Sequence, residues 1–314
     1  MKIVFIGTPW ISAVLLEHII KSGINISDVI CGLDRPLGRK QILTPPPVKT
    51  LAMNYSICVW QPNNIEEMYE VLSKISPDFV LVIAYGMIFT KKILDCARIG
   101  FFNLHFSLLP KYRGPDPIRA QILNNEKEGG VTFFKIDEGI DSGPVLDFAK
   151  VAIEKDDTST TFLNKLIEVS KPLVVSSIKK IISMDFKLYP QTGEPSYTKK
   201  ITVADTFINF DKPSEWIYSR IRAFSYDPYA RFYFSHLGKR KVIQIISGKL
   251  FDKNLDDENI ESGSISGFEK GRGIFVKCLD RSIFIERIKP EGLREMSSYD
   301  YFINGFKMKI GDKL

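Results

Sequence analysis

The chain has 314 residues, which predicts two domains because one domain usually holds about 100–200 residues. Hydrophobic residues make up 44% and charged residues 25% of the sequence, proportions that exclude an intrinsically disordered chain. The formal net charge of +6 is a modest excess and gives only weak support for a polyanionic partner such as nucleic acid.

Other broad classes are disfavoured by particular residues. The four cysteines are widely scattered without a CxxC pair and there are three histidines, so we expect no bound metal and a reducing, cytoplasmic environment. The apolar N-terminus is broken at Gly7, Thr8 and Pro9, which predicts a strand and a turn rather than a signal peptide. The other apolar runs are far shorter than the ~20 residues of a membrane span, so we expect no membrane association.

Up to about residue 185, short apolar runs alternate with helical patterns. Apolar runs without an alternating polar face are typical of parallel strands that helices cover on both sides. The pattern therefore predicts a domain of the α/β class over residues 1–186, with a doubly wound parallel sheet. In chain order the predicted strands are Lys2–Ile6, Val29–Leu33, Ile57–Trp60, Asp78–Ala84, Phe101–His105 and Val131–Asp137, and the predicted helices are Ile11–Ser22, Ile65–Ile75 and Thr160–Met184.

One segment, Leu33–Val48, interrupts this rhythm. From residue 34 it reads DRPLGRKQILTPPPV, with one glycine, four prolines and three basic residues. We expect a long loop here, directly after a strand, and such loops often carry binding residues.

A change of pattern marks the second part of the chain. Residues 187–205 contain proline and glycine without periodicity, and we interpret them as a linker. Residues 206–314 include a predicted helix, Ser214–Phe224, and then short alternating segments separated by glycines and charged turns. The predicted strands indicate a smaller antiparallel β-barrel domain of the OB-like kind, and they are Arg231–Phe234, Val242–Ile246, Gly273–Cys278 and Ser282–Ile288.

Polar side chains gather where two strands of the predicted sheet end. Asn103 and His105 are two residues apart on one strand, so both side chains point to the same face. Asp141 lies in a glycine-bounded loop after another strand. Ligands of doubly wound sheets bind beyond the carboxyl ends of the strands, so this location favours a functional site.

These three residue types suit acyl transfer. An amide NH₂ and a protonated imidazole stabilise a developing oxyanion, while a carboxylate orients the histidine and relays a proton. The sequence has no evident serine or cysteine nucleophile with a base partner, which favours direct attack by a substrate amine. A structural explanation stays open, because a histidine at a strand end is often structural and an aspartate between glycines often satisfies its own turn. The spacing alone does not decide between the two.

The run Asn103-Leu-His105-Phe-Ser107-Leu-Leu-Pro110, with Tyr112-Arg-Gly114 and Asp141-Ser-Gly143, resembles the signature of the folate-dependent formyltransferase family. The resemblance implies a Rossmann-like formyltransferase fold and 10-formyltetrahydrofolate as the formyl donor, with no metal. It also implies that Asn103 holds the formyl oxygen, His105 stabilises the oxyanion, and Asp141 positions His105 and helps to remove the amine proton. By the same resemblance, the folate site is lined by Ser107, Leu108, Leu109, Pro110, Ala84, Tyr85, Gly86, Met87, Ile88, Ile136, Asp137, Glu138, Gly139 and Ile140.

The resemblance covers nearly the whole chain and bears on the acceptor of the formyl group. The opening Phe5–Pro9, the 34–49 segment and the C-terminal segments 296–305 and 311–314 are similar to family members that formylate methionyl initiator tRNA. This implies a monomeric, cytoplasmic enzyme of translation initiation whose residues 206–314 contact tRNA. It also places Arg35, Arg39 and Lys40 against tRNA phosphates, a role that suits basic side chains in a proline-stiffened loop.

Departures from the family pattern keep a second acceptor open. Phe106 stands where small residues are usual, Arg113–Pro117 reads RGPDP where RGAAP is more common, and Phe224–Pro228 lacks the usual tryptophan. Asp116 is unfavourable beside a phosphate and suits an amine or a sugar hydroxyl, so the alternative is a nucleotide-sugar amine N-formyltransferase with the same donor and triad. The intact triad argues against a non-catalytic RNA-binding protein, and the lack of a GxGxxG run after the first strand argues against a dehydrogenase.

Overall fold

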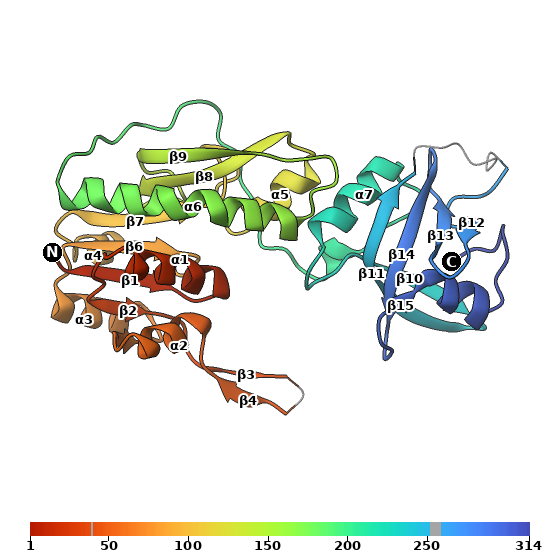
Figure 1. Ribbon diagram of the computed structural model, residues 1–314, viewed down its shortest axis with the longest axis horizontal. Helices are drawn as coiled ribbons and strands as arrows, with labels where there is room; N and C mark the ends of the chain where they lie inside the picture. The colour runs from red at the N-terminus through yellow and green to blue at the C-terminus, as the bar shows by residue number, and fades with distance from the viewer. Residues whose placement is uncertain (39, 252–258) are drawn as a thin grey trace. The chain divides into compact units, whose positions relative to one another are not determined.

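The computed structural model describes residues 1–38, 40–251 and 259–314, and it divides the chain into two compact units (Figure 1). The first unit comprises residues 1–117, 128–152 and 163–199, and the second comprises residues 118–127, 153–162 and 200–314. Within the described residues, no helix has both the length and the apolar character that a membrane span requires.

The first unit is built on a seven-stranded sheet with the order β5-β2-β1-β6-β7-β8-β9. Its strands are β1 (Ile3–Gly7), β2 (Asp28–Ile30), β5 (Cys58–Trp60), β6 (Phe79–Ile83), β7 (Gly100–His105), β8 (Glu128–Lys135) and β9 (Val145–Ala152). Its helices are α1 (Trp10–Lys21), α2 (Pro47–Asn54), α3 (Ile65–Ile75) and α4 (Lys91–Leu94), and both units share α5 (Pro117–Leu123) and α6 (Ser159–Ile182).

All six predicted strands of this unit are present, but the sheet is mixed rather than wholly parallel. Strands β5, β2, β1, β6 and β7 are parallel to one another, as expected. Strand β8, predicted as Val131–Asp137, pairs antiparallel with β7, and β9, which we did not predict, pairs antiparallel with β8. The error has a physical reason, because β8 is buried almost throughout and a buried strand has the same continuous apolar pattern in either direction.

Helices cover both faces of this sheet. On one face, α3 and α4 pack their apolar side chains against Val4, Val80 and Phe101. Alternate strand residues such as Phe5 and Phe102 are fully buried on the other face, and Figure 1 shows α1 and α6 in front of the sheet. The central strands are therefore apolar on both sides, and their polar residues are confined to the ends, where the loops begin.

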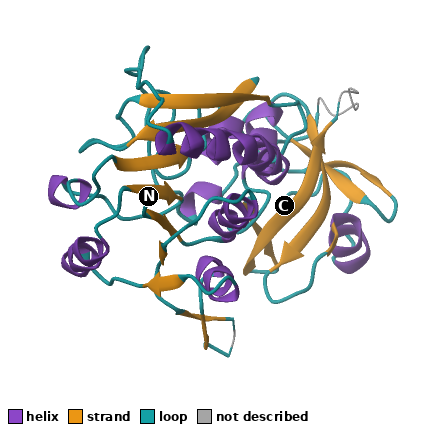
Figure 2. Ribbon diagram, turned by 60° about the vertical axis from the view of Figure 1, so that its left-hand side comes forward, coloured by secondary structure: helices purple, strands orange, loops and turns teal. Residues whose placement is uncertain are grey.

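The prediction that Leu33–Val48 forms a loop without secondary structure is wrong. The segment contains a hairpin of β3 (Arg35–Leu37) and β4 (Ile42–Thr44), and α2 begins at Pro47. In the described part of the chain these two strands pair only with each other, so the hairpin stands apart from the main sheet, as Figure 2 shows. The hairpin and α2 were not predicted because the segment contains a cluster of prolines, although proline is well suited to the first turn of a helix.

The second unit is an antiparallel β domain, which confirms the class of fold expected for residues 206–314. Its sheet runs β10-β11-β14-β13-β12 with β15 added to β14, and among the described residues the two end strands do not pair with each other. The elements are α7 (Ser214–Ala223), β10 (Arg231–His236), β11 (Lys239–Leu250), β12 (Ile265–Glu269), β13 (Gly273–Lys277), β14 (Ser282–Pro290), β15 (Met296–Ser297), a 3-10 turn (Ala204–Thr206) and a π-helical turn (Asp300–Gly305).

Phe102 tests the core of the first unit. Its side chain is fully buried and its ring packs against Phe79 and Phe133, with centroids 6.1 and 5.9 Å away. We expect Phe102→Ala to lower the free energy of unfolding by about 3–5 kcal/mol, because it removes buried area and leaves a cavity. Urea unfolding followed by circular dichroism measures this. Phe148→Ala is the control, since Phe148 is 54% exposed, and equal unfolding midpoints for the two variants would contradict the assignment of Phe102 to the core.

Candidate active site

The candidate site begins at the carboxyl ends of β6 and β7. Asn103 pairs in register with Val82, so Ala84 and the residues after it leave β6 at the same edge of the sheet. Within β7, Leu104 is buried in the core, and Asn103 and His105 both point to the opposite face. The structure thus brings Asn103 and His105 to one face of one strand, as the sequence predicted.

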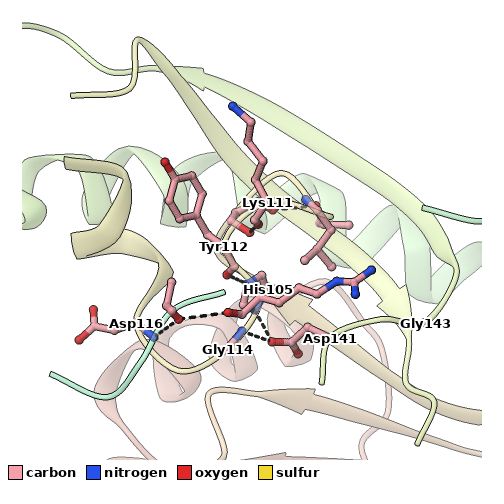
Figure 3. A network of polar contacts seen from close by, with 12 residues as sticks. His105, Lys111, Tyr112, Gly114, Asp116, Asp141 and Gly143 are labelled. Atoms are coloured by element: carbon pink, nitrogen blue, oxygen red, sulfur yellow. Dashed lines mark hydrogen bonds and ion pairs between the residues drawn. The ribbon is translucent and has the colours of Figure 1, made fainter. Parts of the chain in front are cut away.

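His105 is 6% exposed and lies between two acceptors. Its Nε2 lies 2.9 Å from the carbonyl oxygen of Tyr112, which can only accept, so Nε2 carries a proton (Figure 3). Its Nδ1 lies 3.6 Å from Oδ2 of Asp141, a contact that is longer than a hydrogen bond and becomes an ion pair when the ring is protonated. The predicted pair of His105 and Asp141 is therefore in contact. Asn103 is half-buried, and among the described residues its side chain has no hydrogen-bond partner.

The Asp141 carboxylate is fixed by the backbone of a second loop. Its Oδ2 accepts a hydrogen bond from the amide of Gly114, at 2.7 Å, and faces His105 as well (Figure 3). The backbone of Asp141 is left-handed, with φ of 47°, a conformation that aspartate tolerates better than most residues. A Cβ on Gly143 would lie 1.8 Å from the carbonyl oxygen of Lys135, so only glycine fits there. The glycines predicted to shape this loop thus allow its tight return onto β8.

The turn Ser107–Tyr112 holds the carbonyl that contacts His105. The Ser107 hydroxyl donates to the carbonyl of Lys111, at 2.6 Å, and Thr132 on β8 bonds both Ser107 and Leu109. Leu108 packs so closely on Gly130 that a Cβ there would lie 2.6 Å from it. Four of the predicted folate residues, Ser107–Pro110, therefore form a braced turn beside His105.

A cleft of about 750 Å³ opens beside the residues that follow β6. Ala84, Tyr85, Gly86 and Met87 line it together with Gly32 and residues at the base of the hairpin. This volume is within the range of about 300–1,000 Å³ of small-molecule sites. Burial raises the pKa of the Tyr85 phenol, which therefore stays a hydrogen-bond donor at neutral pH.

The remaining predicted folate residues lie on exposed loops. Ile88 and Ile140 are 72% and 54% exposed, which leaves two large apolar side chains open to a ligand. Ile136 packs against the same core cluster as Tyr85 and Met87, so the two loops meet on one side of the sheet. The Asp137 carboxylate is used inside its own loop, where it accepts from the Gly139 amide and the Ser142 hydroxyl, and Glu138 is exposed.

Two of the predicted tRNA-contacting residues belong to the hairpin, Arg35 on β3 and Lys40 between its two strands. Arg35 and Lys40 are exposed, Arg35 also lines the cleft, and Arg39 lies outside the described residues. Lys49 anchors the base of the hairpin, because its ammonium group contacts both Asp34 carboxylate oxygens and the Gln61 amide oxygen. Hydrogen bonds from Lys49 and Gln61 lower the pKa of Asp34.

The segment 189–198, expected to be part of a linker, contacts the loops of the candidate site. Ser196 and Thr198 bond the backbone of Tyr112, Arg113 and Asp116, and Gln191 bonds the Asp141 loop. These contacts join residues about 50 to 85 positions apart, and no local pattern encodes such a distance. The motif around Asn103 and His105 is visible in the sequence, whereas the contacts of the segment that braces it are not. In the described part of the chain, no three His, Cys, Asp or Glu side chains are placed to hold a metal ion.

Family comparison gives a consistent result for both units. Residues 1–178 match the family model described as formyl transferase, and residues 200–307 match the model described as formyl transferase, C-terminal domain. A protein of Caldicellulosiruptor saccharolyticus named methionyl-tRNA formyltransferase is 38% identical, over 100% of both chains. A protein of the same name from Kosmotoga olearia is 36% identical, over 93% of each chain.

Solved structures show the same fold. An N-formyltransferase from Helicobacter canadensis, in complex with folinic acid and dTDP-3-aminofucose, is 26% identical with a TM-score of 0.66. The match covers 91% of this chain and 99% of that one. A sugar 3N-formyl transferase, solved with dTDP and 5-N-formyl-THF, is 24% identical with a TM-score of 0.67, and it supports the fold alone.

Proposed function

The chain belongs to the formyl transferase family, and we propose that it transfers the formyl group of 10-formyltetrahydrofolate to the free amino group of methionyl initiator tRNA. The product is N-formylmethionyl-tRNA, which serves translation initiation. Relatives named methionyl-tRNA formyltransferase match 96–100% of the chain at 31–38% identity. This full-length match favours tRNA as the acceptor.

The contact between His105 and Asp141 is the observation that carries the chemistry. A general acid or base needs a partner that orients it, and the 3.6 Å approach of Nδ1 to Oδ2 supplies that partner. Asn103 adds a side-chain amide on the same strand face, and no hydrogen bond within the described residues occupies its NH₂. The three side chains together offer hydrogen-bond donors and a carboxylate to one reacting carbonyl.

In the proposed mechanism, the amine nitrogen of the acceptor attacks the formyl carbon directly. The Asn103 amide donates to the formyl oxygen, and protonated His105 donates to the same oxygen as negative charge develops on it. Both ring nitrogens of His105 face acceptors of the protein, so one of these two contacts must be exchanged for the substrate. The contact to Asp141 orients the ring and provides the route for the proton, so the Nε2 contact to the Tyr112 carbonyl is the one we expect to be exchanged for the substrate.

Asp141 completes the proton balance. The attacking amine loses a proton when the new C–N bond forms, and N10 of the folate gains one when the old C–N bond breaks. A carboxylate held by the Gly114 amide lies beside the imidazole that can carry this proton. Asp141 therefore accepts the amine proton directly or through His105, and the pair then passes this proton to the leaving N10, which returns both side chains to their starting state.

The donor site is proposed on the residues named from the family motif. The exposed backbone of Ala84–Ile88, the apolar Ile88 and Ile140 and the neighbouring 136–140 loop suit a flat heterocycle with polar edges, and the cleft has the volume for a small molecule. The braced turn Ser107–Pro110 would close one side. When bound, the donor supplies an activated formyl group and a good leaving nitrogen.

The acceptor arm is proposed to bind the hairpin, through Arg35, Arg39 and Lys40, and the second unit. Exposed basic side chains beside the cleft can neutralise phosphates while the aminoacyl end reaches the site. We also propose that the protein works as a monomer in the cytoplasm. Its cysteines in the described residues are free thiols, which suits a reducing compartment.

An acceptor assay tests the proposal. Purified protein receives 10-formyltetrahydrofolate with methionyl initiator tRNA, and separately with amino-sugar nucleotides, and mass spectrometry identifies the product. We expect formylmethionyl-tRNA. Product only from the amino sugar would instead assign the alternative, a nucleotide-sugar amine N-formyltransferase, which Asp116 in the RGPDP segment suits.

Alanine variants test the three catalytic assignments. We expect Asn103→Ala, His105→Ala and Asp141→Ala each to lower turnover by at least about 100-fold, because each removes oxyanion stabilisation or proton transfer. Asp141→Asn, which keeps the shape of the side chain, separates loss of charge from loss of packing. Thermal unfolding is measured in parallel to show that the variants fold. A variant with near-normal turnover would lose its assigned role.

Salt dependence tests the basic residues. We expect the affinity for tRNA to fall steeply with salt, and Arg35→Ala and Arg39→Ala each to reduce the slope of log K against log salt by about 1. Slow hydrolysis of formyl-folate in the absence of tRNA should be unchanged in Arg39→Ala, whereas Arg35 also lines the cleft proposed for the donor. Lys21→Ala, at the far end of α1, is the control and should keep the wild-type slope. A salt-independent affinity would exclude phosphate binding by these residues.

A further inference from the structure

One segment bonds both loops that carry the candidate site. Tyr189 pairs with Val145, directly after the Asp141 loop, through two backbone hydrogen bonds of 2.7 and 2.8 Å. Further along, the Arg113 amide donates to the carbonyl of Ser196, and the Thr198 amide donates to the carbonyl of Arg113. The segment 189–198 therefore spans from the Asp141 loop to the turn that contains Tyr112 and Gly114.

Within this segment, the Gln191 side chain bridges the two loops by itself. Its Nε2 donates to the carbonyls of Asp141 and Gly143, both at 2.8 Å. Its Oε1 accepts from Nη2 and Nε of Arg113, at 2.7 and 3.2 Å. Arg113 in turn donates to the Tyr197 hydroxyl and precedes Gly114, whose amide holds the Asp141 carboxylate. Every hydrogen-bonding atom of the Gln191 amide is thus used.

We propose that Gln191, together with Arg113, is a positioning residue for the formyl transfer, because it fixes the Asp141 carboxylate relative to His105. The effect on turnover rests on the proposed function, whereas the effect on the geometry of the two loops does not. Asp141 reaches His105 only while the Gly114 amide and the Asp141 backbone keep their separation, and the Gln191 bridge ties the two backbones together. Reacting groups lose about 100-fold in rate when a distant change misplaces them by ~1 Å.

The hydrogen bonds at position 191 require a side chain that both donates and accepts, as an amide does. The Asp141 and Gly143 carbonyls can only accept, and the Arg113 guanidinium can only donate, so the residue between them must do both. Gln191→Glu keeps the volume and the bond to Arg113, but it aims a carboxylate oxygen at two carbonyl oxygens. The Asp141 loop would then move away from the Gly114 turn while the rest of the first unit stays unchanged.

Hydrogen–deuterium exchange of the full-length protein tests the geometry without any substrate. We expect the amides in 112–116, Gly114 among them, and in 136–144 to exchange faster in Gln191→Glu than in wild type. Thr192→Glu is the matched control, because Thr192 is the exposed neighbour and the change adds the same charge without touching the bridge. Wild-type exchange in Gln191→Glu, or equal acceleration in both variants, would overturn the proposal.

Kinetics test the consequence for turnover. We expect Gln191→Glu to lower kcat by about 10- to 100-fold with little change in KM for either substrate, and to displace the pH profile of kcat. A merely structural role would scale activity with the folded fraction and leave the profile unchanged, and that result would overturn the proposal. If the wild-type protein formylates no acceptor, the proposed function fails, while the exchange experiment still decides the positioning role.

A double-mutant cycle tests whether the two residues act as a unit. Arg113→Ala and Gln191→Ala should each lower kcat, and the double variant should be no slower than the slower single variant. Multiplicative losses in the double variant would show independent effects and would overturn the joint assignment.

Discussion

The hydrogen bond from the Gly114 amide to the Asp141 carboxylate is the contact on which the candidate site depends. It joins two loops that leave different strands, and its 2.7 Å length is typical of a bond to a charged acceptor. The same oxygen faces Nδ1 of His105, so the bond also sets where the negative charge lies relative to the imidazole. A charge held by backbone needs little reorganisation during a reaction, which is the condition for electrostatic stabilisation.

Backbone strain accompanies this arrangement. Asp141 and Tyr112 both have positive φ, of 47° and 61°, although neither is glycine. Such conformations cost about 1–3 kcal/mol each and persist when the surroundings over-determine them. Here the surroundings are the close approach of Gly143 to Lys135 on one side and the 189–198 segment on the other. The strain therefore lies where two loops are held against each other, beside the proposed reacting groups.

The sequence predicted those parts of the fold and site that local pattern determines. The apolar runs located every central strand, and the spacing of Asn103 and His105 set their common face. The direction of β8 was not predictable, because burial on both faces erases the alternation that marks an antiparallel strand. The hairpin was missed because its six strand residues are mostly exposed and include a proline, and Gln191 was missed because its partners are 48 to 78 residues away.

The residues proposed for the chemistry are buried in the first unit, whereas the hairpin proposed for tRNA recognition is largely exposed. His105 is 6% exposed on a core strand, whereas Leu37, Ile42 and Leu43 on the hairpin are each about 60% exposed. An isolated hairpin with three-residue strands is marginally stable, so the Lys49–Asp34–Gln61 cluster at its base must hold it in place. A site fixed in the core and a hairpin whose side-chain anchor in the described residues lies at its base can change independently. Under the proposed function, the triad serves formyl transfer and the hairpin and the second unit recognise the acceptor, so the two roles fall to separate residues.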